Sequence, residues 1–258
     1  MKKLALTSLL AMFAVSGAHA ANIIDGNPLY MPKAGHFYSV TSVDSHSENI
    51  DSWGLNEEFG YGVTDRLTIN VETGISEDEG FDGIGWDDAS VAGTFRLIEE
   101  GGWKADLLGG YGFGPIWRDH LPHVPFLDKD ATMYAWLVGA RAGYVAGDWT
   151  LAGHVMFSYM NTESFNWGDD GMHMWIAGLD GQYLIDEDWN LVAGVEYTGL
   201  SDDGAHNAGT WTGSFGVNYN INPSAFVGAY IDATMRHATG DWEVDDGFGF
   251  GVKFGVDF

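Results

Sequence analysis

The residues of this chain that could do chemistry recur at every second position of segments whose other positions are apolar. Side chains alternate between the two faces of a β-strand, so this spacing puts the polar residues on one face. The charged members of that set are Glu58, Glu72, Arg96, Lys104, Asp106, Arg141, His154, Asp180, Glu196, Asp232 and Lys253. Because they occupy the register opposite the apolar one, we expect these side chains to line a pore.

Clustered carboxylates are a second candidate for chemistry, because Ca²⁺ and Mg²⁺ prefer hard oxygen ligands. Two stretches are rich in them, SEDEGFDGIGWDD at 76–88 and DWEVDDG at 241–247, and neither has the ligand spacing of an EF-hand loop. The candidate metal ligands are Asp78, Asp82, Asp87, Asp88, Asp241 and Asp245. The alternative is that these carboxylates only keep the loops solvated. We expect no other cofactor.

The composition excludes several classes of function. The chain has 258 residues and no cysteine, which excludes disulfide bonds, thiolate chemistry and cysteine-type zinc sites. Its formal net charge of -26 argues against nucleic acid as a partner, since nucleic acid requires a basic surface. Two early lysines, an apolar run and the small residues Ala18 and Ala20 predict a secretory signal peptide at 1–20, followed by one domain at 21–258.

The alternating pattern predicts twelve strands. They span about 36–43, 52–63, 67–75, 87–98, 103–113, 132–145, 149–160, 173–185, 189–199, 210–221, 224–235 and 247–258. A tilted strand of about ten residues crosses a bilayer, whereas a spanning helix needs roughly 18 apolar residues in a row. Tight turns alternate with longer connections at about 44–51, 76–86, 114–131, 161–172, 200–209 and 236–246. This plan predicts an all-β fold, a transmembrane antiparallel up-and-down β-barrel of about 12 strands.

Aromatic residues mark the ends of the predicted strands. Seven tryptophans stand at or near a strand start, where an aromatic girdle would meet the membrane interface: Trp53, Trp103, Trp136, Trp149, Trp175, Trp189 and Trp211. The chain ends on GFGFGVKFGVDF, in which Phe and Val alternate with small or charged residues. A terminal strand with large apolar residues on one face indicates that lipid lies outside it.

On this architecture and on the terminal VKFGVDF, the chain resembles Gram-negative outer-membrane β-barrel proteins of the porin-like kind. The resemblance covers the whole chain after the signal peptide and points to no particular substrate. It implies location in the cell outer membrane and contact with its lipid and lipopolysaccharide. It also implies that Phe258, at the end of the final strand, is read by the barrel assembly machinery. Ca²⁺ or Mg²⁺ at the acidic loops would then bridge to lipopolysaccharide phosphates.

We therefore expect a porin-like channel for passive diffusion of small hydrophilic solutes. More than half of the acidic residues lie in the long connections, so the outer rim would attract cations and repel anions. The expected solutes are cationic or neutral. The connection at 114–131 is unusually apolar for a loop and is a candidate constriction. The alternative is a structural or surface-binding barrel without a pore.

An outer-membrane hydrolase is the less favoured alternative. His154 and Ser158 share a face, but four residues of strand separate them by about 13 Å, far beyond hydrogen-bond reach. A catalytic pair would need a neighbouring strand, such as His154 with Asp180. Because no compact Ser-His-Asp pattern is present, we expect no enzymatic activity.

Glu57 departs from the alternating pattern, which places it on the lipid face. Two explanations are open. A β-bulge near Glu57 and Glu58 would turn the side chain away from lipid. A position near the membrane interface would make a lipid-exposed charge less costly than at the midplane.

Overall fold

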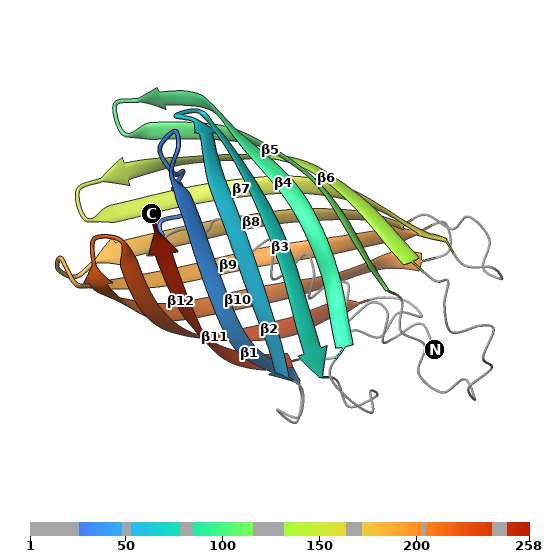
Figure 1. The fold of residues 1–258 in the computed structure, drawn as a ribbon. Helices are drawn as coiled ribbons and strands as arrows, with labels where there is room; N and C mark the ends of the chain where they lie inside the picture. The colour runs from blue at the N-terminus through green and yellow to red at the C-terminus, as the bar shows by residue number, and fades with distance from the viewer. Residues whose placement is uncertain are drawn as a thin grey trace.

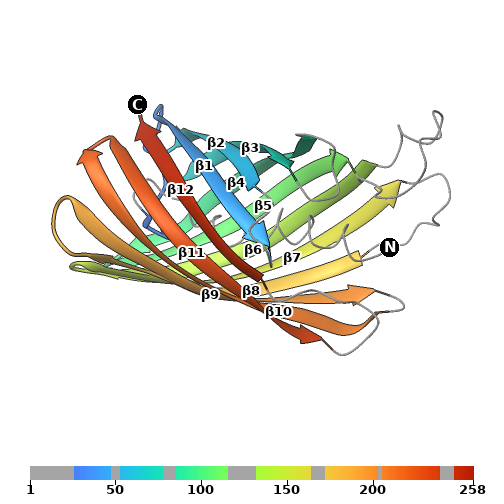
Figure 2. The same ribbon diagram turned by 90° about the horizontal axis from the view of Figure 1, so that it is seen from below.

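The structure is a computed structural model that describes residues 26–47, 53–77, 85–115, 132–163, 172–202, 205–238 and 247–258. Twelve strands lie in these ranges: β1 (Phe37–Ser47), β2 (Trp53–Thr64), β3 (Leu67–Glu77), β4 (Gly85–Glu100), β5 (Trp103–Pro115), β6 (Thr132–Ala146), β7 (Trp149–Glu163), β8 (Met172–Leu184), β9 (Trp189–Asp202), β10 (Ala205–Asn222), β11 (Ala225–Ala238) and β12 (Gly247–Asp257). They form one closed antiparallel barrel (Figures 1 and 2). The predicted fold class and strand number are confirmed. In the described part of the chain, no helix has the length and apolarity to span a membrane.

The first and last strands close the barrel. Strand β12 pairs with β1 in a continuous antiparallel register from Tyr38 opposite Asp257 onward. The backbone N–H of Phe258 donates to the carbonyl of Phe37 at 2.9 Å, and the N–H of Phe37 donates back at 2.8 Å. Their rings stack with centroids 6.0 Å apart. The alternating segment at the end of the chain is therefore the closing strand.

The barrel has a short-turn end, where Phe258 lies, and a long-connection end (Figure 1). The turn between β4 and β5 shows how the sequence builds a tight connection. It contains only Gly101 and Gly102, and both have positive φ values, of 59° and 88°. A two-residue hairpin turn matching the strand twist needs positive φ at both positions, which glycine adopts without steric cost.

Several strands run further at the long-connection end than the sequence pattern predicts. The clearest case is the predicted connection at 200–209. There β9 continues to Asp202 and β10 begins at Ala205, with a register shift between Ala205 and Ala208. The prediction was wrong because alternation reports only the lipid-facing part of a strand. Backbone pairing continues where neither face is apolar.

The outer surface of the barrel is apolar. On β7, Leu151 and Val155 are 60% and 59% exposed, whereas the interleaved Ala152 and His154 are 1% and 6% exposed. The same alternation of exposed apolar and buried residues runs along the last strand, β12. A continuous exposed apolar belt of this size is not stable in water, so it places the strands in membrane lipid.

Two aromatic girdles bound the apolar belt. At the short-turn end, tryptophan packs on tyrosine of the next strand in three pairs, Trp103–Tyr144, Trp149–Tyr183 and Trp189–Tyr219. At the long-connection end the corresponding pairs are Trp136–Tyr159 and Trp175–Tyr197, with Trp211 also on Tyr197. Because indole and phenol rings favour the lipid headgroup level, the girdles mark the two membrane interfaces.

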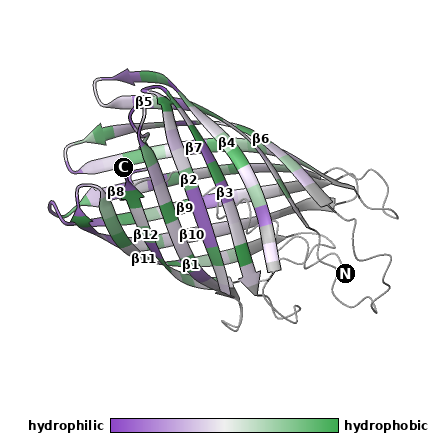
Figure 3. Cartoon of the chain, viewed as in Figure 1, coloured by the Kyte–Doolittle hydropathy of each residue, from purple (hydrophilic) through white to green (hydrophobic). Residues whose placement is uncertain are grey.

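Neither explanation offered for Glu57 is correct. The pairing of β2 with β1 is continuous through Glu57, and with β3 the register shifts only between Gly62 and Thr64. Glu57 also lies four residues from Trp53 and four from Tyr61, about 13 Å along the strand from each, which places it midway across the belt. Glu57 stands between Asn56 and Glu58 in the sequence. Figure 3 shows a hydrophilic stretch midway along β2.

Hydroxyl groups on the same outer face make the lipid-facing position of Glu57 tolerable. The Ser39 hydroxyl donates to one carboxylate oxygen of Glu57 at 2.6 Å, and the Thr41 hydroxyl donates to the other. Both donors come from β1, so the strand next to Glu57 supplies the polar contacts that lipid cannot. A charged or polar group in hydrocarbon needs such internal partners.

Replacing Glu57 with leucine is expected to stabilise the barrel. The leucine would remove a carboxylate from the middle of the lipid-facing belt, which we expect to raise the free energy of unfolding by about 1–2 kcal/mol. Urea unfolding in lipid vesicles, followed by tryptophan fluorescence, measures the change. The matched control is Glu100→Leu at the short-turn end, where the gain should be smaller. A less stable Glu57→Leu barrel would contradict this prediction.

Candidate pore interior

The barrel interior is formed by the strand faces opposite the apolar belt. All eleven charged residues predicted to line a pore lie on described strands. Six of them have almost no solvent exposure: Arg96, Asp106, Arg141, His154, Glu196 and Lys253. The interior therefore holds charged side chains that are packed against other protein groups, and their partners decide what the interior can bind.

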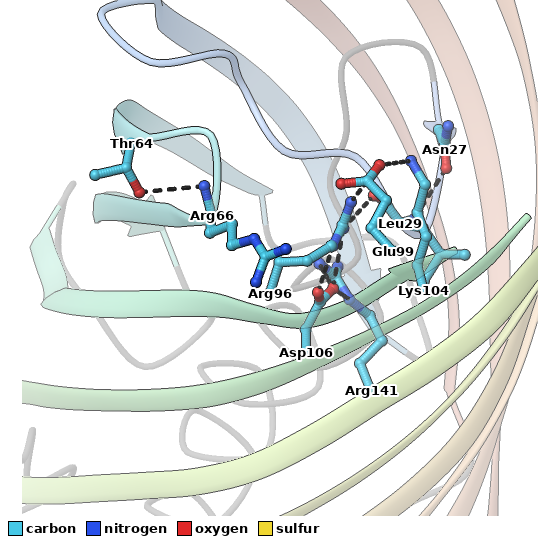
Figure 4. A network of polar contacts seen from close by, with 9 residues as sticks. All are labelled: Asn27, Leu29, Thr64, Arg66, Arg96, Glu99, Lys104, Asp106 and Arg141. Atoms are coloured by element: carbon cyan, nitrogen blue, oxygen red, sulfur yellow. Dashed lines mark hydrogen bonds and ion pairs between the residues drawn. The ribbon is translucent and has the colours of Figure 1, made fainter. Parts of the chain in front are cut away.

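An arginine cluster, made of Arg96, Asp106 and Arg141, lies in the half of the interior near the short-turn end (Figure 4). Nε of Arg96 donates to Oδ1 of Asp106 at 2.7 Å, and its Nη2 donates to Oδ2 at 3.2 Å. Arg141 donates to Oδ2 from Nε at 2.9 Å and from Nη2 at 2.7 Å. Two guanidinium groups thus share one carboxylate, and charge-assisted bonds of this kind are among the stronger protein contacts.

The arginine cluster extends toward the rim through a local irregularity of β4. The β4–β5 register shifts between Arg96 and Ile98, so Leu97 and Ile98 are both exposed on the outer face. A bulge of this kind re-aims the residues that follow it. Glu99 then lies 3.6 Å from Arg96 and 3.3 Å from Nζ of Lys104.

A second cluster surrounds His154 on β7. Its Nδ1 lies 2.9 Å from Oδ2 of Asp180, and its Nε2 lies 3.1 Å from Oε2 of Glu196. The Thr198 hydroxyl donates to the other oxygen of Glu196 at 3.4 Å. Both ring nitrogens are thus occupied by carboxylates. Among the residues that the structure describes, no serine or threonine hydroxyl contacts the imidazole, so the cluster does not have the arrangement of a nucleophile and its base.

The inward carboxylates of β1–β4 form an acidic wall. Its members are Asp44, Glu58, Glu72 and Asp88. The pairing register places Glu58 directly opposite Glu72. Tyrosine and amide side chains donate to two of these carboxylates. Tyr230 and Asn56 donate to Asp44, and Tyr38 and Asn70 donate to Glu58.

Asp232 and Lys253 lie on adjacent strands, but the structure does not bring them together. Asp232 pairs with Gly249, which is four residues from Lys253 along β12 and about 13 Å away. Nζ of Lys253 lies 5.7 Å from the centroid of the Phe226 ring. Lys253 is 6% exposed, so it belongs to the packed part of the interior.

The N-terminal segment, residues 26–36, enters the barrel. The carbonyl of Leu29 accepts a hydrogen bond from Nη2 of Arg96 at 2.7 Å, and Leu29 is 0% exposed (Figure 4). A Cβ atom added to Gly26 would lie 2.3 Å from Val192 on β9 and 2.7 Å from the Asn218 side chain on β10. The segment thus contacts β4 and the β9–β10 region on different sides of the interior.

The other end of the N-terminal segment is tied to the rim at the short-turn end. The Tyr30 hydroxyl donates to Asp257 at 3.0 Å, and the N–H of Ala34 donates to Asp65 at 3.1 Å. The N–H of Gly35 donates to the carbonyl of Gly62 at 2.8 Å. These contacts run from inside the barrel to its edge, so the segment crosses the interior and narrows it at this end.

A small cavity lies beside the N-terminal segment. Its volume is about 60 Å³, and Tyr30, Met31 and Pro32 of the segment form one side. Strands from β1 to β7 form the rest, with both polar and apolar side chains. Since a buried water molecule needs roughly 10–15 Å³ of such space, the cavity has room for a few waters or a ligand of similar size.

The predicted loop sites fall largely outside the described residues. This holds for Asp78, Asp82, Asp241 and Asp245, for the signal peptide at 1–20 and for most of the connection at 114–131. Asp87 is placed only by its backbone, and Asp88 lies on β4, where its carbonyl accepts a bond from Thr73 at 2.8 Å. Within the described ranges, no group of three or more acidic or histidine side chains is arranged to hold a metal ion.

The barrel is similar to solved outer-membrane proteins. An outer membrane channel from Pseudomonas putida F1 matches with 14% identity and a TM-score of 0.59, over 92% of this chain and 100% of that one. The NanC porin matches with 11% identity and a TM-score of 0.58, over 84% and 98%. The chain has the fold of an outer-membrane β-barrel. OmpT of Vibrio cholerae also matches, with 14% identity and a TM-score of 0.51, over 88% and 99%. No protein-family model and no curated protein matches the chain.

The sequence pattern does not reveal the role of the N-terminal segment. Alternation cannot identify residues 26–36, because they form no strand. A signal was nevertheless present in PLYMP, residues 28–32, since an apolar run ahead of the first strand needs a buried place to pack.

Proposed function

We propose that this protein is an outer-membrane channel for passive diffusion of small hydrophilic solutes, cationic or neutral. The observation that carries the proposal is a closed barrel with a lipid-facing belt outside and charged residues inside. The similar structures include one described as a channel and one described as a porin, which supports the same function. The proposal needs no covalent chemistry and no cofactor.

The preference for cations rests on charge. The chain carries 37 acidic residues against 11 Lys and Arg, for a net charge of -26. In the arginine cluster two guanidinium groups share one carboxylate, whereas the described contacts of Glu58 in the acidic wall come from the neutral donors Tyr38 and Asn70. An entrance and an inner wall of one sign raise the local concentration of ions of the opposite sign.

Single-channel recording tests the proposal. The mature protein, refolded and inserted in a planar bilayer, is expected to conduct steadily, and a KCl gradient is expected to give a reversal potential that favours K⁺. The selectivity should weaken as salt is raised, because screening shortens the reach of the acidic groups. A reversal potential that favours Cl⁻ would contradict the cation preference, and a silent bilayer would contradict the channel.

A barrel without a through-pore is the second candidate function. The N-terminal segment favours it, because Leu29 and the arginine cluster pack together with almost no exposed area. Such a barrel would act as a structural or surface-binding protein. Silence of the complete chain in the same recording is its expected signature.

Export and assembly complete the proposal. Residues 1–20 would direct export and be removed, and Phe258 would be read by the barrel assembly machinery. The Phe258 side chain is 66% exposed on the closed barrel, which leaves its ring available at the short-turn end. Lipopolysaccharide would contact the long-connection end, with Ca²⁺ or Mg²⁺ between its phosphates and the acidic loops.

A further inference from the structure

The cavity beside the N-terminal segment contains a carboxylate with an open oxygen. Tyr38 and Asn70 both donate to the same atom, Oε1 of Glu58, at 2.6 and 3.0 Å. No described side chain donates to Oε2, and no described lysine, arginine or histidine contacts this carboxylate. Glu58 therefore has one carboxylate oxygen without a donor, and no cationic partner, in the described part of the barrel.

A second polar atom in the same cavity has no partner. Thr68 is 5% exposed, and its hydroxyl oxygen makes no hydrogen bond with any described residue. Thr68 and Glu58 both line the cavity. Buried polar atoms are nearly always hydrogen-bonded, so an orphaned hydroxyl facing a cavity indicates a missing partner inside it.

Part of the remaining cavity wall is apolar. Leu108, Leu137 and Met156 come from β5, β6 and β7. Arg141 also lines the cavity, but its Nε and Nη2 donate to Asp106 and not to Glu58. A ligand that satisfies this cavity needs a cationic donor at one end and a short apolar body at the other. A bare metal ion would leave the apolar wall without contacts.

We propose that this cavity binds small organic cations with a primary ammonium group and a short alkyl body. The ammonium group donates to Oε2 of Glu58 and to the hydroxyl of Thr68, and the alkyl body contacts Leu108, Leu137 and Met156. The inference rests on the proposed channel function and deepens it, because it names a class of solute that would bind in the interior during passage.

Calorimetry on the refolded complete mature chain in detergent at low salt tests the site. The probes are n-butylammonium, n-butanol and butyrate, which share an alkyl body and differ in charge. We expect saturable binding of n-butylammonium alone. Glu58→Gln keeps the shape of the side chain and the acceptor for Tyr38, and is expected to weaken binding at least tenfold, because it removes a charge-assisted hydrogen bond.

Two further variants separate the site from a general effect of charge or folding. Glu57→Gln makes the same change on the adjacent residue, which faces outward, and should leave butylammonium binding unchanged. Thr68→Val should weaken it severalfold, because it removes the second polar contact. The heat-dependent gel mobility of a closed barrel verifies that each variant is folded. Equal binding of butanol, or unchanged binding in folded Glu58→Gln, would overturn the proposal, as would the absence of any heat with the unaltered chain.

This test separates failure of the site from failure of the channel. Binding in detergent does not require conduction, so Glu58-dependent binding with silent bilayers would support the site and overturn the channel. Steady conduction without butylammonium binding would overturn the site and leave the channel standing.

Discussion

Replacing Asp106 with asparagine is expected to lower the free energy of unfolding of the barrel by about 3–5 kcal/mol. The Asp106 side chain is 0% exposed and is the shared partner of Arg96 and Arg141. Asparagine fills the same space but removes the buried counter-charge that the two guanidinium groups share. Removing one partner of a buried charge network is far more damaging than removing an exposed one. Urea unfolding in lipid vesicles, followed by tryptophan fluorescence, measures the loss.

Glu99→Gln is the matched control for Asp106. It also removes a carboxylate beside Arg96, but the side chain is 50% exposed and lies 3.6 Å from the arginine. Its expected loss is below about 1 kcal/mol, as for exposed ion pairs in general. If Asp106→Asn and Glu99→Gln unfold at the same urea concentration, the arginine cluster does not contribute more to the stability of the barrel than an exposed ion pair.

Removing the N-terminal segment is expected to raise the conductance several-fold. A mature chain that begins at residue 35 lacks Leu29 and its contact with Arg96, and also lacks Tyr30 and its contact with Asp257. The strands remain, because their pairing does not involve the removed residues. The interior near the short-turn end would then be open to water. Single-channel recording of both chains in the same bilayer and salt gives the ratio.

Tyr30→Phe is the control for the truncation. It removes only the hydrogen bond to Asp257 and keeps the ring that packs edge-on against Tyr38 at 6.0 Å. We expect its conductance to match that of the unaltered chain. A truncated barrel that is folded, by circular dichroism and gel mobility, yet conducts no better would show that the N-terminal segment does not limit the pore.

The fold follows from the sequence because a membrane barrel repeats one simple rule along each strand. Apolar residues such as Leu151 and Val155 must face lipid, and the residues between them must face the interior, so alternation reports strands directly. The predicted strand ends were less accurate beyond the lipid-facing part of the strands, as between β9 and β10. Alternation also placed the eleven charged residues on one face, but it carries no information about which of them touch.

Only the tertiary structure decided the contacts across strands and across the interior. His154 contacts Asp180 and Glu196 because of the register of three strands. Asp106 forms ion pairs with Arg96 and Arg141 for the same reason. Glu57 is tolerated in lipid because β1 presents Ser39 and Thr41 beside it. The N-terminal segment has no periodicity at all, and its place inside the barrel depends on contacts with residues far along the chain, such as Asp257. The sequence by itself therefore determined the barrel and its lipid face, which depend on a local repeat. The side-chain contacts in the interior, and the place of the N-terminal segment there, depend on which residues the closed sheet brings together.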